Sequence, residues 1–410
     1  MPLRPAVGGA GSCAGEPMRP LRAIVHNPDW DYAGGGEKVT AVIAERLARA
    51  GWNVELTGGA APDIPRLERV LNVNLAGCRF RGTPQEWTSA LKKLSRLSPR
   101  AARFISGRTA FSFASGADLL VHITGSIPPL CPARAGLLFV QFPYDPAESI
   151  RISSDGSPER WADRDKLARL ASWDVRVCPS SFVQEWVRRR WSLDCQVLHP
   201  PAETAACSPL PKEQLILTAG RFYATGPTKK HAVMVRAFRE LCDSGLQDWK
   251  LVVAGGTHPR PDHQQYLEEV RALAEGYPVD VVTDLSFQEI LPLYGRAAIY
   301  WHATGAGEDE MARPDLFEQF GMTIVEAMAS GAVPVVIGGG GIRDIVRSGT
   351  DGFLWQTPDE LKSRTLELIR DTQLRTSLSR NAIARAEKFS RGAFEAKVDG
   401  IISDLENRLK

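Results

Sequence analysis

Two glutamates, Glu318 and Glu326, lie eight positions apart in the stretch LFEQFGMTIVEAMASG, residues 316–331. The apolar run AIYWHA at 298–303 predicts a strand, and a helix is predicted to begin near Phe320. Glu318 then lies at a strand-to-helix turn and Glu326 about two turns farther along, so both side chains point to similar sides at different depths. The two carboxylates can accept hydrogen bonds from the hydroxyls of one elongated polyol. A helix-start acid and an exposed glutamate are the alternative interpretation.

The start of the same helix can bind an anion. The first backbone N–H groups of a helix have no partner within it, and here they belong to Phe320, Gly321, Met322 and Thr323. Such groups, together with the helix dipole, suit a diphosphate oxygen.

Two basic residues follow another predicted strand, LILTAGRF at 215–222. Arg221 comes at the end of that strand, and Lys229 comes at the opening of the next helix. Two fixed cations at this place can hold a diphosphate, although a solvated basic loop is the alternative.

A third turn, Gly34-Gly35-Gly36, lies between the first predicted strand and the first predicted helix. Glycines leave room for the close approach of a phosphate or a sugar, but this run is not the GxGxxG pattern. The three turns together supply phosphate donors and hydroxyl acceptors at the carboxyl ends of strands. They favour a nucleotide-sugar site.

The elements that position these turns alternate between strand and helix. The chain has 410 residues, and 43% of them are hydrophobic, so it is long enough for two or three domains. Strands are predicted at 21–27, 52–59, 117–124, 135–143, 175–181 and 195–201, and a helix is predicted at 36–51. The alternation restarts at 215 after a Pro- and Ala-containing link at 199–213. Residues 80–110 are basic and less regular.

This pattern predicts an α/β protein with two doubly wound, Rossmann-like domains that face a central cleft. The expected parts are a disordered leader at 1–20, an acceptor domain at 21–205, a nucleotide-sugar domain at 206–390, and a C-terminal helix at 391–410 that packs back on the first domain.

Composition excludes several function classes. Lys and Arg number 50 against 48 Asp and Glu, so no global attraction to nucleic acid is expected. The seven cysteines are scattered and form no CxxC pair, which indicates neither a disulfide framework nor a zinc site. The sequence has no apolar run of about 18 residues and no signal peptide, so a cytoplasmic protein is expected.

The ordered motifs resemble glycosyltransferase family 4. FEQFGMTIVEAMASGAVPVV is similar to the Glu-x7-Glu signature of that family, and the GR…KK and GGGEKV blocks resemble its other two motifs. HNPDWDYAGGGEKV, FVQFPYDP, CPSSFVQEW and LHPP resemble blocks of the mannosyltransferases that build dolichol-linked oligosaccharide, and of their bacterial relatives. The similarity covers roughly residues 22–400.

The resemblance implies a GT-B fold and transfer with retention of anomeric configuration, without a metal or another cofactor. It also implies roles for individual residues. Arg221 and Lys229 would neutralise the leaving diphosphate, Glu318 would contact the hydroxyls of the sugar beside the amides of Gly321 and Met322, and Glu326 would hold the ribose. The remaining donor-binding positions would be Gly35, Gly36, Phe320 and Thr323.

The sequence departs from the family pattern at three places. Gln141 stands where relatives often have a histidine near the reacting carbon; glutamine can hydrogen-bond a sugar but cannot titrate. Gln319 replaces the histidine that often follows the first signature glutamate, and Asp344 stands where glutamate is common. Two other histidines lie close to the motifs, His302 and His231.

Three segments have two open interpretations each. Asp29-Trp30-Asp31 matches the DxD metal pattern of another glycosyltransferase fold, but its place in the first βα loop argues against a metal site. The basic segment 91–108 either touches anionic lipid at the inner face of a membrane or is a solvated basic face. The acidic loop at 305–315 either covers the donor or is a solvated turn.

The predicted function is transfer of a hexose, with GDP-mannose slightly favoured as the donor, to a hydroxyl of a glycan, lipid-linked or small-molecule acceptor. The alternatives are a sugar-nucleotide epimerase or phosphorylase on the same fold, and a non-catalytic donor-binding partner. Base, sugar, acceptor and oligomeric state cannot be read from the sequence.

Overall fold

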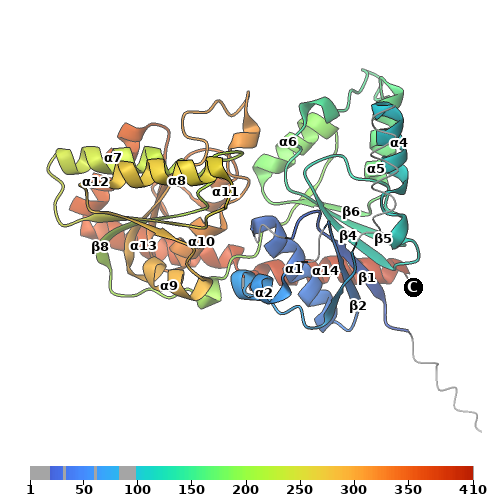
Figure 1. The fold of residues 1–410 in the computed structure, drawn as a ribbon, viewed down its shortest axis with the longest axis horizontal. Helices are drawn as coiled ribbons and strands as arrows, with labels where there is room; N and C mark the ends of the chain where they lie inside the picture. The colour runs from blue at the N-terminus through green and yellow to red at the C-terminus, as the bar shows by residue number, and fades with distance from the viewer. Residues whose placement is uncertain (1–18, 31–33, 60–61, 83–97, 410) are drawn as a thin grey trace, which may run out of the picture.

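Two parallel sheets form the framework of the protein (Figure 1). The computed structural model describes residues 19–30, 34–59, 62–82 and 98–409. The first sheet has seven strands in the spatial order β3-β2-β1-β4-β5-β6-β7. Its strands are β1 (Arg22–His26), β2 (Asn53–Thr57), β3 (Cys78–Phe80), β4 (Leu119–Thr124), β5 (Ala135–Val140), β6 (Val175–Cys178) and β7 (Gln196–Val197).

The second sheet has six strands in the order β10-β9-β8-β11-β12-β13. They are β8 (Glu213–Ala219), β9 (Lys250–Gly255), β10 (Val279–Thr283), β11 (Ala297–His302), β12 (Val333–Ile337) and β13 (Phe353–Trp355). All described strand pairs in both sheets are parallel, so crossover connections join them, and most of these contain a helix.

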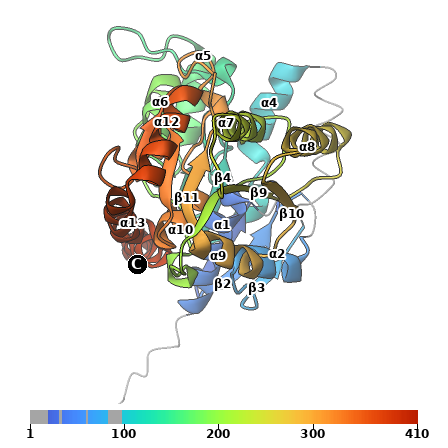
Figure 2. The same cartoon turned by 90° about the vertical axis from the view of Figure 1, so that its left-hand side faces the viewer.

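Helices lie on both faces of each sheet (Figure 1). The first domain contains α1 (Gly35–Arg49), α2 (Ile64–Leu71), α4 (Pro99–Thr109), α5 (Trp161–Ala171) and α6 (Ser181–Trp191). The second domain contains α7 (His231–Asp243), α8 (Pro261–Ala274), α9 (Phe287–Arg296), α10 (Met322–Ala329), α11 (Ile342–Ile345), α12 (Pro358–Arg370) and α13 (Thr372–Ala386). Figure 2 shows the second domain end-on, with α7 and α8 on one side of its sheet and α9 on the other. The chain continues into α14 (Arg391–Leu409).

The last helix lies against the first domain, although it follows the second domain in sequence (Figure 1). Its buried apolar side chains belong to the core that also contains residues of α1 and β1. These side chains are Phe394, Val398, Ile402 and Leu405. Polar contacts with the same domain support the packing, because Arg46 pairs with Asp399 at 2.6 Å.

The predicted fold class is confirmed, and several boundaries shift. The helix predicted near Phe320 begins at Met322, and the stretch 80–110, described above as less regular, contains α4. Pro99 is the first residue of α4, where the missing N–H of proline costs no hydrogen bond. No helix in the described ranges is long and apolar enough to cross a membrane.

Candidate active site

The carboxylate of Glu318 lies between a cation and an imidazole. The ammonium of Lys229, which comes just before α7, donates to Glu318 Oε2, and His302 Nε2 at the end of β11 lies 3.0 Å from the same oxygen. Because a carboxylate only accepts, the proton between them belongs to His302 Nε2. Burial works against the charged form, but Lys229 and His302 hold the pKa of Glu318 well below its ordinary value. The glutamate is therefore a fixed anion.

Glycines after β12 place the main chain of this glutamate. Gly341 N–H donates to Glu318 O at 2.8 Å, and a Cβ at Gly341 would collide with the carbonyl oxygen of Gln319. Gly340 has a φ of +60°, a conformation that favours glycine. The run 338–341 therefore allows the turn that carries Glu318 to pass close to the end of the neighbouring strand.

The start of α10 follows directly. Gly321 is its N-cap with a φ of +119°, and Met322 and Thr323 form its first turn. The ring of Phe320 is buried and stacks on His199 at a centroid distance of 5.3 Å. The buried ring of Phe320 therefore serves packing, and the predicted contact of this residue with the donor substrate concerns its main-chain N–H.

The glycine turn of the first domain faces this region of the second domain. A Cβ at Gly34 would lie 3.0 Å from Arg221 Nη1, and a Cβ at Gly35 would lie 3.2 Å from Met322 Cε. A Cβ at Gly36 would collide with the amide of Gln141. The structure thus brings the glycine run, Gln141, Arg221 and the start of α10 together from two domains.

The two basic residues of the predicted phosphate site are held differently. The guanidinium carbon of Arg221 lies 4.7 Å above the ring of Tyr223, and Arg221 is exposed. Lys229 is tied to Glu318, but an ammonium has three donors, so one bond to a carboxylate leaves capacity for a phosphate oxygen.

Glu326 lies in different surroundings, one turn and more into α10. Its carboxylate accepts a hydrogen bond from the main-chain N–H of Glu203 and lies 3.4 Å from the hydroxyl of Tyr294. Burial raises the pKa of Glu326 to about 7; the charge of Lys38 opposes the shift and that of Glu203 adds to it. This carboxyl group therefore titrates near neutral pH.

Sequence reasoning missed the residues around Glu326. Lys38 belongs to the GGGEKV block, and that block was the one available signal for it. Glu203 lies in the link between the domains, and Tyr294 lies on α9. Neither residue belongs to a sequence motif. His302, in contrast, stood out by its place beside the signature loop. His231 is buried against Phe222 at a ring distance of 4.5 Å and has no contact with Glu318.

Two departures from the family pattern have structural roles. Asp344 on α11 accepts from the main-chain N–H of Ser181 at 2.7 Å, at the start of α6 in the other domain. It therefore joins the two domains. Gln319 donates to Phe317 O at 2.8 Å, a contact within its own turn.

The segments with two interpretations are partly described. The Trp30 indole is buried and donates to Thr57 O at 3.0 Å, while Asp31 lies outside the described residues. Among the residues that the structure does describe, no cluster of His, Cys, Asp and Glu could hold a metal ion.

Residues 91–97 of the basic segment also lie outside the described part, and Arg108 pairs with Asp165 at 3.2 Å. In the acidic loop, Glu308 pairs with Lys230 at 2.6 Å and Glu310 pairs with Arg343.

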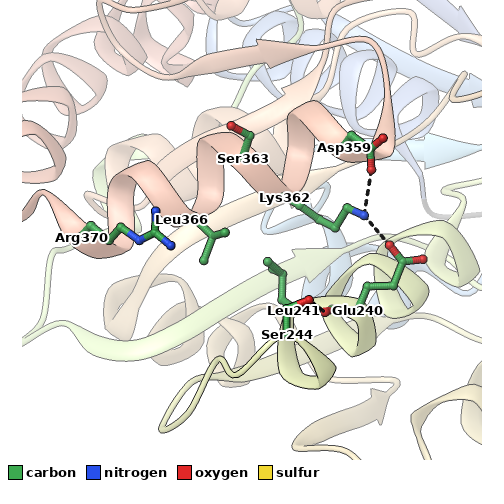
Figure 3. A pocket seen from close by; sticks show the side chains of 8 residues that line it. All are labelled: Glu240, Leu241, Ser244, Asp359, Lys362, Ser363, Leu366 and Arg370. Carbon is green, nitrogen blue, oxygen red and sulfur yellow. Dashed lines mark hydrogen bonds and ion pairs between the residues drawn. The ribbon is translucent and has the colours of Figure 1, made fainter.

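A pocket on the outer face of the second domain is separate from these residues (Figure 3). It lies between α7 and α12, where Lys362 bonds both Asp359 and Glu240. None of its lining residues belongs to the motifs above.

Comparison with known proteins agrees with the resemblance to glycosyltransferases that the motifs indicate. Residues 206–385 match the family described as "Glycosyl transferases group 1". GDP-Man:Man(3)GlcNAc(2)-PP-Dol alpha-1,2-mannosyltransferase of Mus musculus is 24% identical over 54% of this chain and 46% of its own length. The chain thus spans about half of that relative. D-inositol 3-phosphate glycosyltransferase of Salinispora arenicola is 25% identical over 92% of this chain and 88% of its own length.

Solved structures share the fold. Sucrose-phosphate synthase from Thermosynechococcus elongatus has a TM-score of 0.68 at 18% identity, with 95% of this chain and all of that chain (100%) covered. Anabaena Alr3699/HepE in complex with UDP and glucose has a TM-score of 0.67 at 17% identity, with 93% and 99% covered. Residues 206–385 therefore form a domain of the glycosyl transferases group 1 family, and the chain shares its two-domain GT-B fold with these solved structures.

Proposed function

We propose that this protein transfers a hexose from a nucleotide diphosphate sugar to a hydroxyl acceptor, with retention of configuration and without a metal. The observation that carries the proposal is the Lys229–Glu318–His302 cluster beside the start of α10. A fixed anion for sugar hydroxyls and a cation for phosphate lie at one helix start, opposite the glycine turn of the other domain.

In this proposal each charged group has one task. Arg221 and Lys229 neutralise the leaving diphosphate together with the first N–H groups of α10. Glu318 accepts hydrogen bonds from hydroxyls of the transferred sugar and so fixes its orientation. Glu326 accepts from the ribose hydroxyls. Gln141, which packs against Gly36, hydrogen-bonds the sugar from the first domain in this proposal.

The chemical step then needs positioning and charge stabilisation more than an added base. The bond from the anomeric carbon to the leaving phosphate oxygen breaks, and the acceptor oxygen bonds to the same carbon on the same face. The acceptor proton passes to the leaving phosphate oxygen. Burial lowers the pKa of His302, although Glu318 opposes that shift, so the imidazole stays neutral. Its one proton remains on Nε2 and is donated to Glu318.

GDP-mannose is the donor that we favour. The names of the relatives from mouse and human specify GDP-Man as the donor of those mannosyltransferases. Alr3699/HepE was solved with UDP and with UDP-glucose, so other nucleotides occur on this fold. Direct competition between the two nucleotides therefore tests the choice.

The test is a thermal-shift series with GDP, UDP, dTDP, ADP and their common sugars, followed by transfer assays with the donor that binds. A selective rise with GDP and GDP-mannose is expected, because a ligand that binds the folded state stabilises it by mass action. Product formed without an added acceptor would favour an epimerase, and a need for free phosphate would favour a phosphorylase. Binding without turnover would favour a donor-binding partner, and no shift with any nucleotide would overturn the proposal.

A further inference from the structure

The chain crosses between the domains twice, and the two crossings are hydrogen-bonded to each other. Ala202 N–H donates to Phe389 O at 3.2 Å, and Arg391 N–H donates to Ala202 O at 2.8 Å. Glu203, the next residue of the first crossing, is 6% exposed. A charged residue at this depth requires partners.

The carboxylate of Glu203 finds these partners in the first domain and at the start of α14. Lys38 of α1 donates to its Oε1, Arg391 Nη1 lies 3.3 Å from the same oxygen, and Asn72 Nδ2 lies 3.2 Å from Oε2. Lys38 also donates to Leu71 O at the end of α2. Three elements that are distant in sequence are thus tied to one side chain.

The main chain of Glu203 points the other way, toward the second domain. Its N–H donates to the carboxylate of Glu326 on α10. Lys38 on α1 and the phenol of Tyr294 on α9 act on Glu326, and its charge in turn acts on the phenol of Tyr300 on β11 and on the buried thiol of Cys207. Lys38 is the cation among these groups, and Glu203 is their second carboxylate.

We infer that Glu203 is a positioning residue for the donor site: its main chain orients Glu326, and its carboxylate, held by Lys38 and Arg391, sets the charge around that glutamate. The inference rests on the proposed function, in which Glu326 holds the ribose. It adds that the crossing between the domains tunes nucleotide binding, although Glu203 itself touches no substrate.

The charges give the inference a direction. An ionised Glu326 accepts from ribose hydroxyls better than a protonated one, so nucleotide affinity should rise with pH through the titration of Glu326, near neutrality. Removal of the like charge of Glu203 favours the ionised form and moves this rise to lower pH. Removal of the positive charge of Lys38 moves it to higher pH.

The experiment measures the dissociation constant of GDP from pH 5.5 to 9, by titration calorimetry, for the wild-type protein, Glu203→Gln and Lys38→Met. If another nucleotide gave the larger thermal shift, it replaces GDP. Glu55→Gln is the matched control, because it removes a carboxylate paired with Arg22 at 2.8 Å in the same domain, away from α10. Shifts of the midpoint on the order of one pH unit, acidic for Glu203→Gln and alkaline for Lys38→Met, are expected.

Two variants with opposite expected shifts keep the test informative even if one does not fold. A shift in the expected direction in the variant that folds, with none in Glu55→Gln, supports the inference. Weaker binding at every pH with an unchanged midpoint would indicate a purely structural role and overturn it. If the wild-type protein bound no nucleotide, the proposed function would fall, and the inference with it.

Discussion

Glu318 and Glu326 lie in one short segment, but their surroundings move their pKa values in opposite directions. Glu318 faces Lys229 and His302, which overcome the effect of burial and keep its pKa low. Glu326 is also removed from water, but it shares its cation with Glu203, and its pKa rises to about 7. The comparison shows that the balance of neighbouring charges, more than residue type or burial, decides which carboxylate is a permanent anion.

The contrast extends to stability. A carboxyl group with a lowered pKa in the folded state stabilises the protein above its unfolded pKa, and this contribution is lost as the pH falls. A carboxyl group with a raised pKa costs stability as the pH rises from its unfolded pKa to its folded pKa, and the full cost remains at higher pH. Glu318 therefore adds to the free energy of unfolding at neutral pH, whereas Glu326 subtracts from it, fully so above about pH 7.

The largest expected effect comes from Glu318→Gln, which removes the fixed anion and keeps the shape. We expect kcat to fall by about 100-fold or more, because the hydroxyls of the transferred sugar lose the carboxylate that accepts their hydrogen bonds and Lys229 loses its partner. Glu308→Gln, which removes the partner of Lys230 nearby, is the control and should keep most of the activity. A Glu318→Gln enzyme with wild-type kcat would sink the role given to this residue.

Lys229→Met should remove the charge that keeps the pKa of Glu318 low, and this loss should appear in the stability of the protein. Glu318 would keep its burial but lose its main cation, so the free energy of unfolding at pH 7 should drop by about 1–3 kcal/mol. The deficit should shrink toward pH 4, where the glutamate of the variant is protonated. Denaturant unfolding at both pH values measures it. Lys230→Met is the control, and an equal loss there would contradict the special place of Lys229.

Glu326→Gln should change the free energy of unfolding in the opposite direction. At pH 8 the wild-type protein holds an ionised carboxylate at a site that prefers the neutral form, so the variant should be more stable by about 1–3 kcal/mol. The gain should shrink as the pH falls and vanish below the unfolded pKa, toward pH 4. The variant should also bind the nucleotide more weakly and lose the rise of affinity near pH 7. A wild-type pH profile in Glu326→Gln would assign the titration to another group.

The smallest effect concerns the glycine turn, which allows the start of α1 to approach the start of α10. Gly36→Ala forces the Gln141 amide to move, and a side-chain end can move at modest cost. We expect a rise of the donor KM by several-fold, on the order of 1 kcal/mol, with little change in stability. Gly82→Ala, where an added Cβ meets nothing, is the control.

Periodicity and turn chemistry predicted most of the fold. Met234, Ala237, Phe238 and Leu241 recur at helical spacing in the sequence, and all four are buried in α7. The strands of both sheets followed from short apolar runs between turns, since a parallel sheet buries both of its faces. Boundaries were less certain, because the Phe-Gly step before α10 holds a left-handed glycine that delays the helix to Met322.

Some residues of the candidate site could be predicted from local sequence pattern, and others could not. Arg221, Lys229, Glu318 and the glycine turn could be chosen because each lies at the carboxyl end of a strand, and such ends meet. The Lys38–Glu203 pair joins positions 165 residues apart, in a link whose composition suggests nothing but a turn. Long-range contacts of this kind depend on how two finished domains pack, which no local pattern encodes.

The return of α14 to the first domain also bears on how the protein can be divided. The second domain is one continuous piece of chain, whereas the first is assembled from two pieces that the second domain separates. A fragment that ends at the first crossing would leave bare the apolar surface that Phe394, Val398, Ile402 and Leu405 cover. A workable fragment of the first domain would need α14 joined back by a short linker, beside the place where Ala202 and Arg391 already meet.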